Sequence, residues 1–486
     1  MALSSVVRRG PAAGLAVIAL GALGALGALA CDGKSPHAEA AAVGERPGAA
    51  GEPVHNAYGH AVASLLPEHW SDLRQGKALF VTTWVARGEV AAERAARGPA
   101  AQVREGLGPL FNESSCQGCH FRDGRGRPIH DTRQRSAREP ERTGSPLLLR
   151  LGLAGPGDQL LPEPAYGTQL QDRALAPFFA EGAFDVTVRP LAGRYPDATV
   201  FALELPVVTL RALRAGPLQH DTRLSLRLPP SLIGLGLLEA IPEADILALA
   251  DPDDTNGDGV SGRPSQVRDP RTGARALGRF GWKASQPSLW LQNATALRED
   301  LGVTTPVFPE PVCPAGEPAC APAAAPELAA AELELLTRYT RLLGPPERRG
   351  VGDAVVARGE AVFTRVGCAA CHHPRFVTGE VADLPELAHR TIEPYSDLLL
   401  HDLGEALSDH RPEGDAHGPE WRTAPLWGLG LLRAVSGEVR LLHDGRAHSP
   451  EEAILWHGGE AQAARDRFAS APREDRAALL RFVDAL

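Results

Sequence analysis

Apolar residues along the chain recur mostly at helical spacing, and proline and glycine interrupt them. The clearest case is residues 330–346, AAELELLTRYTRLLGPP, a periodic helical stretch that Pro345 and Pro346 bring to an end. Residues 226–251 predict a loop followed by a helix. Strand signals are short and weak, with a hairpin expected around 184–208. The pattern therefore predicts a mainly α-helical fold with long loops.

A short internal repeat divides this pattern. Residues 359–372, GEAVFTRVGCAACH, join a glycine, an apolar helical stretch ending in phenylalanine, and a CxxCH motif. Residues 106–120 echo this arrangement, and residues 76–85 repeat its glycine–helix–phenylalanine opening further upstream. The two CxxCH motifs are too far apart for one small domain, so we expect one cytochrome c-like domain around each.

Each motif contains the residues that attach a c-type haem. Its two cysteines can form thioethers with the porphyrin, and the following histidine can bind the iron. The residues are Cys116, Cys119 and His120 in the first motif, and Cys368, Cys371 and His372 in the second. Two four-ligand zinc sites are the alternative, but a zinc pair would not need the adjacent histidine twice. We therefore predict two covalently attached haem c groups.

The N-terminus has the pattern of an export signal. Arg8 and Arg9 precede an apolar run that ends at Cys31, as in a lipoprotein whose cysteine is lipidated. Ala28 stands where leucine is usual, and simple cleavage near Ala30 is the alternative. We expect an exported, periplasmic protein held at the membrane only through a lipid anchor on Cys31.

These observations predict five segments. They are a signal peptide over 1–31, a flexible linker over 32–54, a first cytochrome c-like haem domain over 55–150, a middle region over 151–345 that packs between the haem domains, and a second cytochrome c-like haem domain over 346–486. The 60 acidic residues outnumber the 50 basic residues, which argues against a nucleic-acid partner. Cys313 and Cys320 share a proline-rich loop and are expected to form a disulfide, with two reduced thiols as the alternative.

An acidic loop in the middle region has the spacing of a calcium site. Asp254, Asn256 and Asp258 alternate, and Gly259 occupies the sixth position, where the chain must turn. Ser265 stands at the twelfth position, where a bidentate glutamate is expected. Calcium is the prediction, and a loop whose side chains bond their own backbone is the alternative.

The sixth ligands of the two irons pose a separate question. The chain has one methionine, Met1, which lies in the signal peptide. Histidine, tyrosine, or an open position holding water are therefore the options that composition leaves. An open position is what peroxide needs, because the iron must bind the oxidant directly.

Several stretches of the sequence resemble bacterial di-haem oxidoreductases, which are distantly similar to di-haem cytochrome c peroxidases. The stretches include GPLFNESSCQGCHFRDGRG, PPSLIGLGLLEAIPE, GRFGWKASQPS, EPYSDLLLHDLGEAL, EWRTAPLWGLG, LLHDGRA and EAILWHGGEA, and the likeness runs from about residue 55 to the C-terminus. The resemblance implies one haem that relays electrons, one that meets hydrogen peroxide, and calcium between the domains. Family members often have methionine in the stretch that reads LLLHDLG here, where this chain has Leu403. Related peroxidases have methionine or tyrosine near an HDG motif, which Leu442 precedes in this chain.

The family-like stretches supply the candidate ligands and catalytic groups. Tyr395, His401 and His443 are candidates for the position opposite a proximal histidine, and His457 is a further one. His457 and Glu460, three residues apart, are also candidates for moving a proton during peroxide cleavage. For each of these residues, hydrogen bonding or packing is the simpler role.

Three functions remain open from the sequence. The first is a peroxidase-like oxidoreductase with one five-coordinate haem, using a small redox substrate such as hydrogen peroxide and a periplasmic electron donor or acceptor protein. The second is a pure electron-transfer cytochrome with two six-coordinate irons. The third, a thiol oxidoreductase, is weakest because Cys313 and Cys320 lack a CxxC arrangement. We expect the haem on His120 to be the reactive one, because fewer candidate ligands lie near it in the sequence.

Overall fold

The computed structural model describes residues 54–127, 147–314, 320 and 325–486. The predicted signal peptide, the lipid site at Cys31 and nearly all of the predicted linker lie outside these residues. Within the described ranges, no helix is long and apolar enough to cross a membrane.

Helices and short strands alternate along the described chain. The α-helices are α1 (Trp70–Val81), α2 (Val90–Arg97), α3 (Cys116–Cys119), α4 (Leu235–Glu239), α5 (Glu243–Leu247), α6 (Leu289–Leu301), α7 (Ala330–Leu342), α8 (Ala354–Val366), α9 (Leu432–Ser436), α10 (Pro450–Trp456), α11 (Gln462–Ser470) and α12 (Arg473–Ala485). The strands are β1 (Thr83–Val85), β2 (Val103–Glu105), β3 (Leu110–Phe111), β4 (Leu148–Ala154), β5 (Leu160–Leu161), β6 (Arg173–Ala174), β7 (Ala183–Arg194), β8 (Val200–Arg211), β9 (Arg223–Arg227), β10 (Gln266–Arg268), β11 (Arg275–Leu277), β12 (Phe376–Val377), β13 (Thr391–Ile392), β14 (Leu400–Asp402) and β15 (Glu420–Arg422).

The prediction of a mainly α-helical fold with two cytochrome c-like domains is wrong, because 32% of the structure is helical and 19% lies in strands. Many of the strands are only two or three residues long, and they pair with distant segments, as β3 does with β6 and β14 with β15. Such a short strand carries no alternating pattern of its own. Local periodicity therefore underestimated the strand content.

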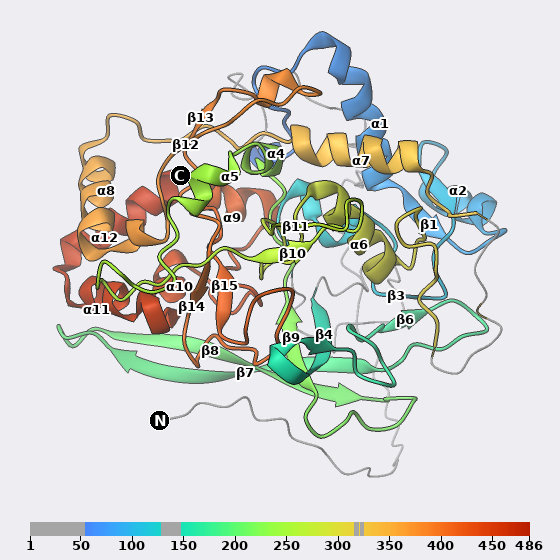
Figure 1. The fold of residues 1–486 in the computed structure, drawn as a ribbon, viewed down its shortest axis with the longest axis horizontal. Helices are drawn as coiled ribbons and strands as arrows, with labels where there is room; N and C mark the ends of the chain where they lie inside the picture. The colour runs from blue at the N-terminus through green and yellow to red at the C-terminus, as the bar shows by residue number, and fades with distance from the viewer. Residues whose placement is uncertain (1–53, 128–146, 315–319, 321–324) are drawn as a thin grey trace, which may run out of the picture.

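Two of the elements that the pattern predicted are present. β7 and β8 form the expected hairpin, with a register that runs from Ala183 opposite Arg211 to Arg194 opposite Val200. Figure 1 shows this hairpin extending along one side of the molecule. The periodic stretch before Pro345 forms α7. Residues 226–251, where a loop and one helix were expected, begin with the end of β9 and contain two short helices, α4 and α5.

Two pairs of helices lie toward opposite ends of the molecule in Figure 1, α1 with α7 and α8 with α12. In both pairs a glycine lies where the helices cross. A Cβ atom on Gly76 would come within 2.3 Å of the Leu335 carbonyl oxygen, and one on Gly359 within 2.0 Å of the Ala478 carbonyl oxygen. Only glycine permits such close approach of two backbones.

The same helix pairs reveal how the sequence repeat is built. The phenylalanine four residues after each glycine contacts an aromatic side chain of the partner helix. Phe80 lies 5.3 Å from Tyr339 between ring centroids, and Phe363 lies 5.3 Å from Phe482. The echo at 106–111 is not helical, since it contains β3. The counterpart of α8 is therefore α1, which the upstream repeat at 76–85 had indicated.

The largest apolar core joins the two predicted haem domains and the middle region. It contains Leu73 of the predicted first domain, Leu238 and Leu336 of the middle region, and Val362 and Phe482 of the second domain. α7 belongs to the predicted middle region but packs on α1 of the predicted first domain. The first helix pair is therefore assembled from segments that are far apart in the sequence.

We predict that Gly359→Ala lowers the free energy of unfolding by about 1–3 kcal/mol, because the added methyl group collides with the backbone of α12. Alanine is the better helix former, so intrinsic propensity alone would give the opposite sign. Denaturant unfolding measures the change. Thr364→Ala, an exposed substitution in the same helix, is the control and should change stability by less than about 0.5 kcal/mol. Equal stability of Gly359→Ala and the parent protein would contradict the packing argument.

Candidate functional site

The first CxxCH motif forms the one-turn helix α3, which the side chain of Ser115 caps by accepting a hydrogen bond from the Gly118 amide. The ring of His120, which follows, is fixed by backbone carbonyls: its Nδ1 lies 3.0 Å from the Pro230 oxygen and 3.3 Å from the Gly124 oxygen. Nδ1 therefore donates its proton, and Nε2 keeps a free lone pair. Burial lowers the pKa of His120, which keeps the ring neutral.

The second motif repeats this arrangement. Cys368–Ala370 form a short 3₁₀ turn at the end of α8, and the Nδ1 of His372 donates to the Tyr395 carbonyl oxygen at 2.8 Å. Burial lowers the pKa of His372 to about 4. Metal-binding histidines characteristically hold their second nitrogen in this way, because the hydrogen bond fixes the tautomer and the orientation of the ring. Both histidines are thus prepared to bind a metal through Nε2.

A cavity lies at each motif. The first has a volume of about 410 Å³ and is lined by Cys116, Cys119 and His120 together with side chains of the middle region. The second has a volume of about 510 Å³ and is lined by Cys368, Cys371 and His372. Volumes of this size are typical of cofactor-binding pockets. Each cavity therefore combines space, two thiols and an available imidazole nitrogen.

Buried arginines lie where the two cavities adjoin. Arg125 and Arg422 line both cavities. The guanidinium of Arg125 donates to the Leu442 carbonyl, while its Nε has no partner in the described part of the chain. Arg422 donates to the carbonyls of Gly281 and Thr423. Burial lowers the pKa of both to about 10, because no carboxylate of the described residues forms an ion pair with either group.

These features fit haem. A buried guanidinium without an anionic partner is costly, and the carboxylates of a porphyrin would satisfy Arg125 and Arg422. The buried indole nitrogen of Trp427, on the wall of the first cavity, also lacks a partner among the described residues. The two CxxCH motifs would hold the macrocycles, and His120 and His372 would hold the irons.

His401 lies in the second cavity but has both ring nitrogens engaged. Nδ1 is 2.7 Å from Glu460, and Nε2 is 2.8 Å from Asp397. Burial alone would lower the pKa of His401, but its hydrogen bonds to Asp397, Cys371 and Glu460 raise it well above the ordinary value. A doubly hydrogen-bonded imidazolium has no lone pair for iron, which argues against His401 as a distal ligand.

Tyr395 lies outside both cavities. Its hydroxyl donates to Glu360 of α8 at 2.9 Å and accepts from Arg348 at 3.3 Å. Its backbone carbonyl accepts the hydrogen bond from His372. The geometry therefore assigns Tyr395 to the proximal side, where it orients the histidine, in place of the distal role considered from the sequence.

His443 and His457 both line the second cavity. His443 stacks on Trp421, with 3.8 Å between ring centroids and 8° between ring planes, and burial lowers its pKa to about 3. The Nδ1 of His457 lies 2.6 Å from the Ala453 carbonyl oxygen. Glu460 accepts hydrogen bonds from His401, from the Asp402 amide and from Ser261. The structure thus places the predicted catalytic pair at the second motif, and its catalytic role stays a prediction.

The comparison with known proteins decides the family. Residues 208–486 match the model of a family described as "Di-haem oxidoreductase, putative peroxidase". The chain belongs to this family. No curated protein and no solved structure matches the chain. The family match includes the second CxxCH motif, Arg422 and His457, whereas the first motif lies N-terminal to it.

The acidic loop of this di-haem oxidoreductase lies beside the second cavity, which Asp258 lines. Within the loop, the Asp258 amide donates to Asn256 at 2.8 Å, and the Gly259 amide donates to Asp254 at 3.2 Å. These hydrogen bonds are expected of a loop whose side chains bond their own backbone, which was the alternative to calcium binding. Calcium binding by Asp254, Asn256 and Asp258 stays a prediction.

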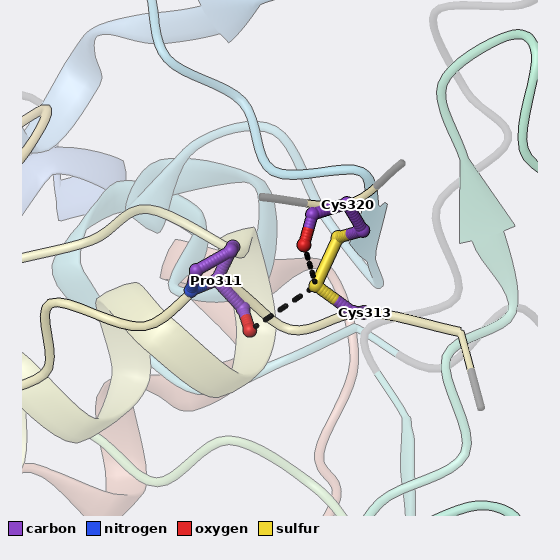
Figure 2. The surroundings of a disulfide bond; sticks show 3 residues. All are labelled: Pro311, Cys313 and Cys320. Atoms are coloured by element: carbon purple, nitrogen blue, oxygen red, sulfur yellow. Dashed lines mark hydrogen bonds between the residues drawn. A yellow bond between two sulfur atoms is a disulfide. The ribbon is translucent and has the colours of Figure 1, made fainter. Parts of the chain in front are cut away.

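Cys313 and Cys320 form the disulfide that the sequence suggested. Figure 2 shows the bond, with the Cys313 sulfur 3.7 Å from the Pro311 carbonyl oxygen. The remaining described cysteines line the two cavities, and burial raises the pKa of each thiol, for Cys116 and Cys368 to about 12. A buried thiol of raised pKa is a poor nucleophile. The cysteines therefore give no support to thiol oxidation.

Sequence reasoning missed residues whose roles depend on tertiary structure. Trp282 lines both cavities and donates from its indole nitrogen to the Leu228 carbonyl at 2.8 Å. Of three other tryptophans, Trp427 lines the first cavity, Trp421 lines the second, and Trp290 lines neither. Arg125, in the RDGRG stretch after the first motif, and Arg422 carried no local signal that distinguished them from exposed arginines.

We predict that protonated His401 stabilises the fold by its contacts with Asp397 and Glu460. Because the folded pKa of His401 is raised, this stabilisation is complete below about pH 6.5, the ordinary histidine pKa, and is lost as the pH rises toward the folded pKa. His401→Gln should lower the free energy of unfolding by about 3–5 kcal/mol below about pH 6.5. At higher pH the difference should become progressively smaller.

Denaturant unfolding of the parent and the variant across this pH range measures the difference. His389→Gln is the control, because His389 pairs with Glu380 at the surface. Its effect should stay below about 1 kcal/mol throughout. A cost of His401→Gln that does not fall as the pH rises would show that the pKa of His401 is not raised in the folded protein.

Proposed function

We propose that this chain is an exported di-haem c-type oxidoreductase with peroxidase-like activity. Hydrogen peroxide reacts at the His120 site, and electrons enter through the His372 site from a periplasmic donor protein. The haems are attached through thioethers to the two cysteine pairs, and Cys31 anchors the mature protein through lipid. The sequence motifs support export, anchoring and covalent attachment, and membership of the di-haem oxidoreductase family supports the redox chemistry.

One difference between the cavities supports assigning peroxide chemistry to the first site and electron entry to the second. Among the described residues that line the first cavity, His120 is the one histidine, whereas the second cavity also has His401, His443 and His457. The phenol of Tyr58, which lines the first cavity, donates to the Gly428 carbonyl. Burial raises the pKa of Tyr58, so the phenol stays neutral and is a weak ligand. The side of the first cavity opposite His120 is therefore the one suited to an external oxidant.

A haem iron with a free sixth position supplies the site at which the oxygen–oxygen bond of peroxide can be cleaved. The protein must then bind the peroxide, move a proton between its two oxygens, and stabilise charge. These tasks require titratable and hydrogen-bonding side chains on the wall of the cavity.

Asp300 is suited to hold the proton. Its side chain lines the first cavity and accepts a hydrogen bond from the amide of Gln169 at 3.0 Å. Burial raises the pKa of Asp300 to about 6, although the guanidinium of Arg150 opposes the shift. A carboxyl group with this pKa exchanges protons readily near neutral pH. Glu413, on the same wall, has a lowered pKa because Arg227 and Arg411 outweigh burial, so it stays ionised.

The loaded protein should give two distinct ferric signals in electron paramagnetic resonance. We expect a high-spin signal from the His120 site that disappears with stoichiometric hydrogen peroxide, and a low-spin signal from the His372 site that remains. A Cys116→Ala, Cys119→Ala variant should lose one covalent haem, the high-spin signal and the peroxide response together. Two low-spin signals indifferent to peroxide, also after half-reduction, would make the protein an electron carrier.

Asp300→Asn should lower kcat/KM for hydrogen peroxide by about 100-fold, the usual contribution of a positioned proton-transfer group. The parent activity should change with pH around 6, and the variant should lose this dependence. Haem content and the high-spin signal should be unchanged. Asp245→Asn, a substitution at an exposed position in α5, is the control and should have the parent activity. Parent-like activity of Asp300→Asn would exclude the carboxyl group from proton transfer.

A further inference from the structure

His457 is held in the same way as the two proximal histidines. Each of the three rings donates from Nδ1 to a backbone carbonyl: His120 to Pro230, His372 to Tyr395, and His457 to Ala453. In each case Nε2 is left with a free lone pair. The described chain thus has three histidines in a metal-binding orientation, although only two belong to CxxCH motifs.

The end of α10 causes this orientation. His457 is the residue that ends the helix, and the last carbonyls of a helix have no amide partner within it. The ring folds back onto the carbonyl of Ala453, four residues earlier, at 2.6 Å. Gly458 and Gly459 follow at once and pack against the backbone of Leu403 and Gly404. Both ends of this short segment are therefore fixed, and the imidazole cannot turn freely.

His457 and His372 line the same cavity. Leu403 and Leu442, which line the cavity as well, have no atom that binds iron. The indole nitrogen of Trp456 is buried without a partner among the described residues, but it cannot donate a lone pair.

The other two histidines of this cavity are committed elsewhere. His401 has both nitrogens bound to carboxylates. His443 lies flat on Trp421, the ring that also receives Lys283 and Arg227 at 4.5 Å each, so it belongs to a polar cluster around this tryptophan. In the described part of the chain, no backbone carbonyl holds the Nδ1 of His443 as that of Ala453 holds His457. His457 is the histidine whose geometry matches that of a ligand.

We propose that His457 is the sixth ligand of the iron bound by His372, so that the second haem has two axial imidazoles. The proposal rests on the proposed function, since it requires a haem at the second motif. The bond forms when the Nε2 lone pair of His457 enters the vacant position of the iron, without oxidation, reduction or proton release. Such a site is closed to peroxide and has a lower reduction potential than one with axial methionine.

Spectroscopy of the loaded ferric protein tests the assignment. The low-spin electron paramagnetic resonance signal of the second haem should convert to high-spin in His457→Ala, and added imidazole should restore it. His443→Ala, which removes another buried histidine from the same cavity, is the matched control and should keep the low-spin signal. Covalent haem content, measured for each variant, shows that the second site is still loaded.

A second variant guards against misfolding of His457→Ala. His457→Met should keep a low-spin iron, gain a sulfur-to-iron charge-transfer band, and raise the reduction potential of the second haem. A low-spin signal that survives in His457→Ala would overturn the proposal, and its loss in His443→Ala alone would assign the ligand to His443. The peroxide response of the first haem is read from the high-spin signal of the parent, so failure of the proposed function is distinguishable from failure of this assignment.

Discussion

The close crossing of two helices at a glycine is the constraint on which both haem sites depend. At Gly76 and Gly359 the partner backbone occupies the volume that a side chain would need. The phenylalanine one turn later then meets an aromatic ring of the partner helix and also approaches the proximal histidine, Phe80 at 6.3 Å from His120 and Phe363 at 6.2 Å from His372. A bulkier residue at either crossing would separate the helices and open the wall of the cavity. The fold around the two pairs differs, but this contact is common to both.

The electrostatics of the two cavities are balanced in different ways. In the second, the charge of His401 is neutralised by Asp397 and Glu460, and Glu460 also binds the loop that contains Ser261. Between the cavities, the acceptors that the described residues offer to Arg125 and Arg422 are all carbonyls. The charge of His401 is balanced without any cofactor. The charges of Arg125 and Arg422 remain available to an anionic group. Burial of an unpaired guanidinium costs several kcal/mol, so the protein without haem should favour a more open arrangement of these arginines.

The sequence predicted features whose signals are local. The CxxCH motifs, α7 before Pro345 and the β7–β8 hairpin could all be inferred from a few consecutive residues. The short strands could not, because β3 and β14 are defined by partners far along the chain. The carbonyls that orient His120 and His372 belong to distant segments, at Pro230 and Tyr395, and no spacing rule indicates them. The hydrogen bond between His457 and Ala453 spans only four residues, so its spacing is local. Nothing in the sequence indicates, however, that the Ala453 carbonyl accepts from an imidazole and not from a backbone amide.

The wide separation of α1 from α7 has a consequence for how the protein is assembled. More than half of the chain lies between Gly76 and its contact at Leu335, whereas α8 and α12 belong to one continuous C-terminal stretch. Closing a long loop costs more conformational entropy than closing a short one, and contacts between distant segments form slowly. The second helix pair can therefore form as soon as its own residues are present, while the cysteines of the first motif remain accessible until the middle of the chain has folded back on them. The order of the segments thus gives the first site a longer period in which a bulky planar group can reach its thiols before the walls close.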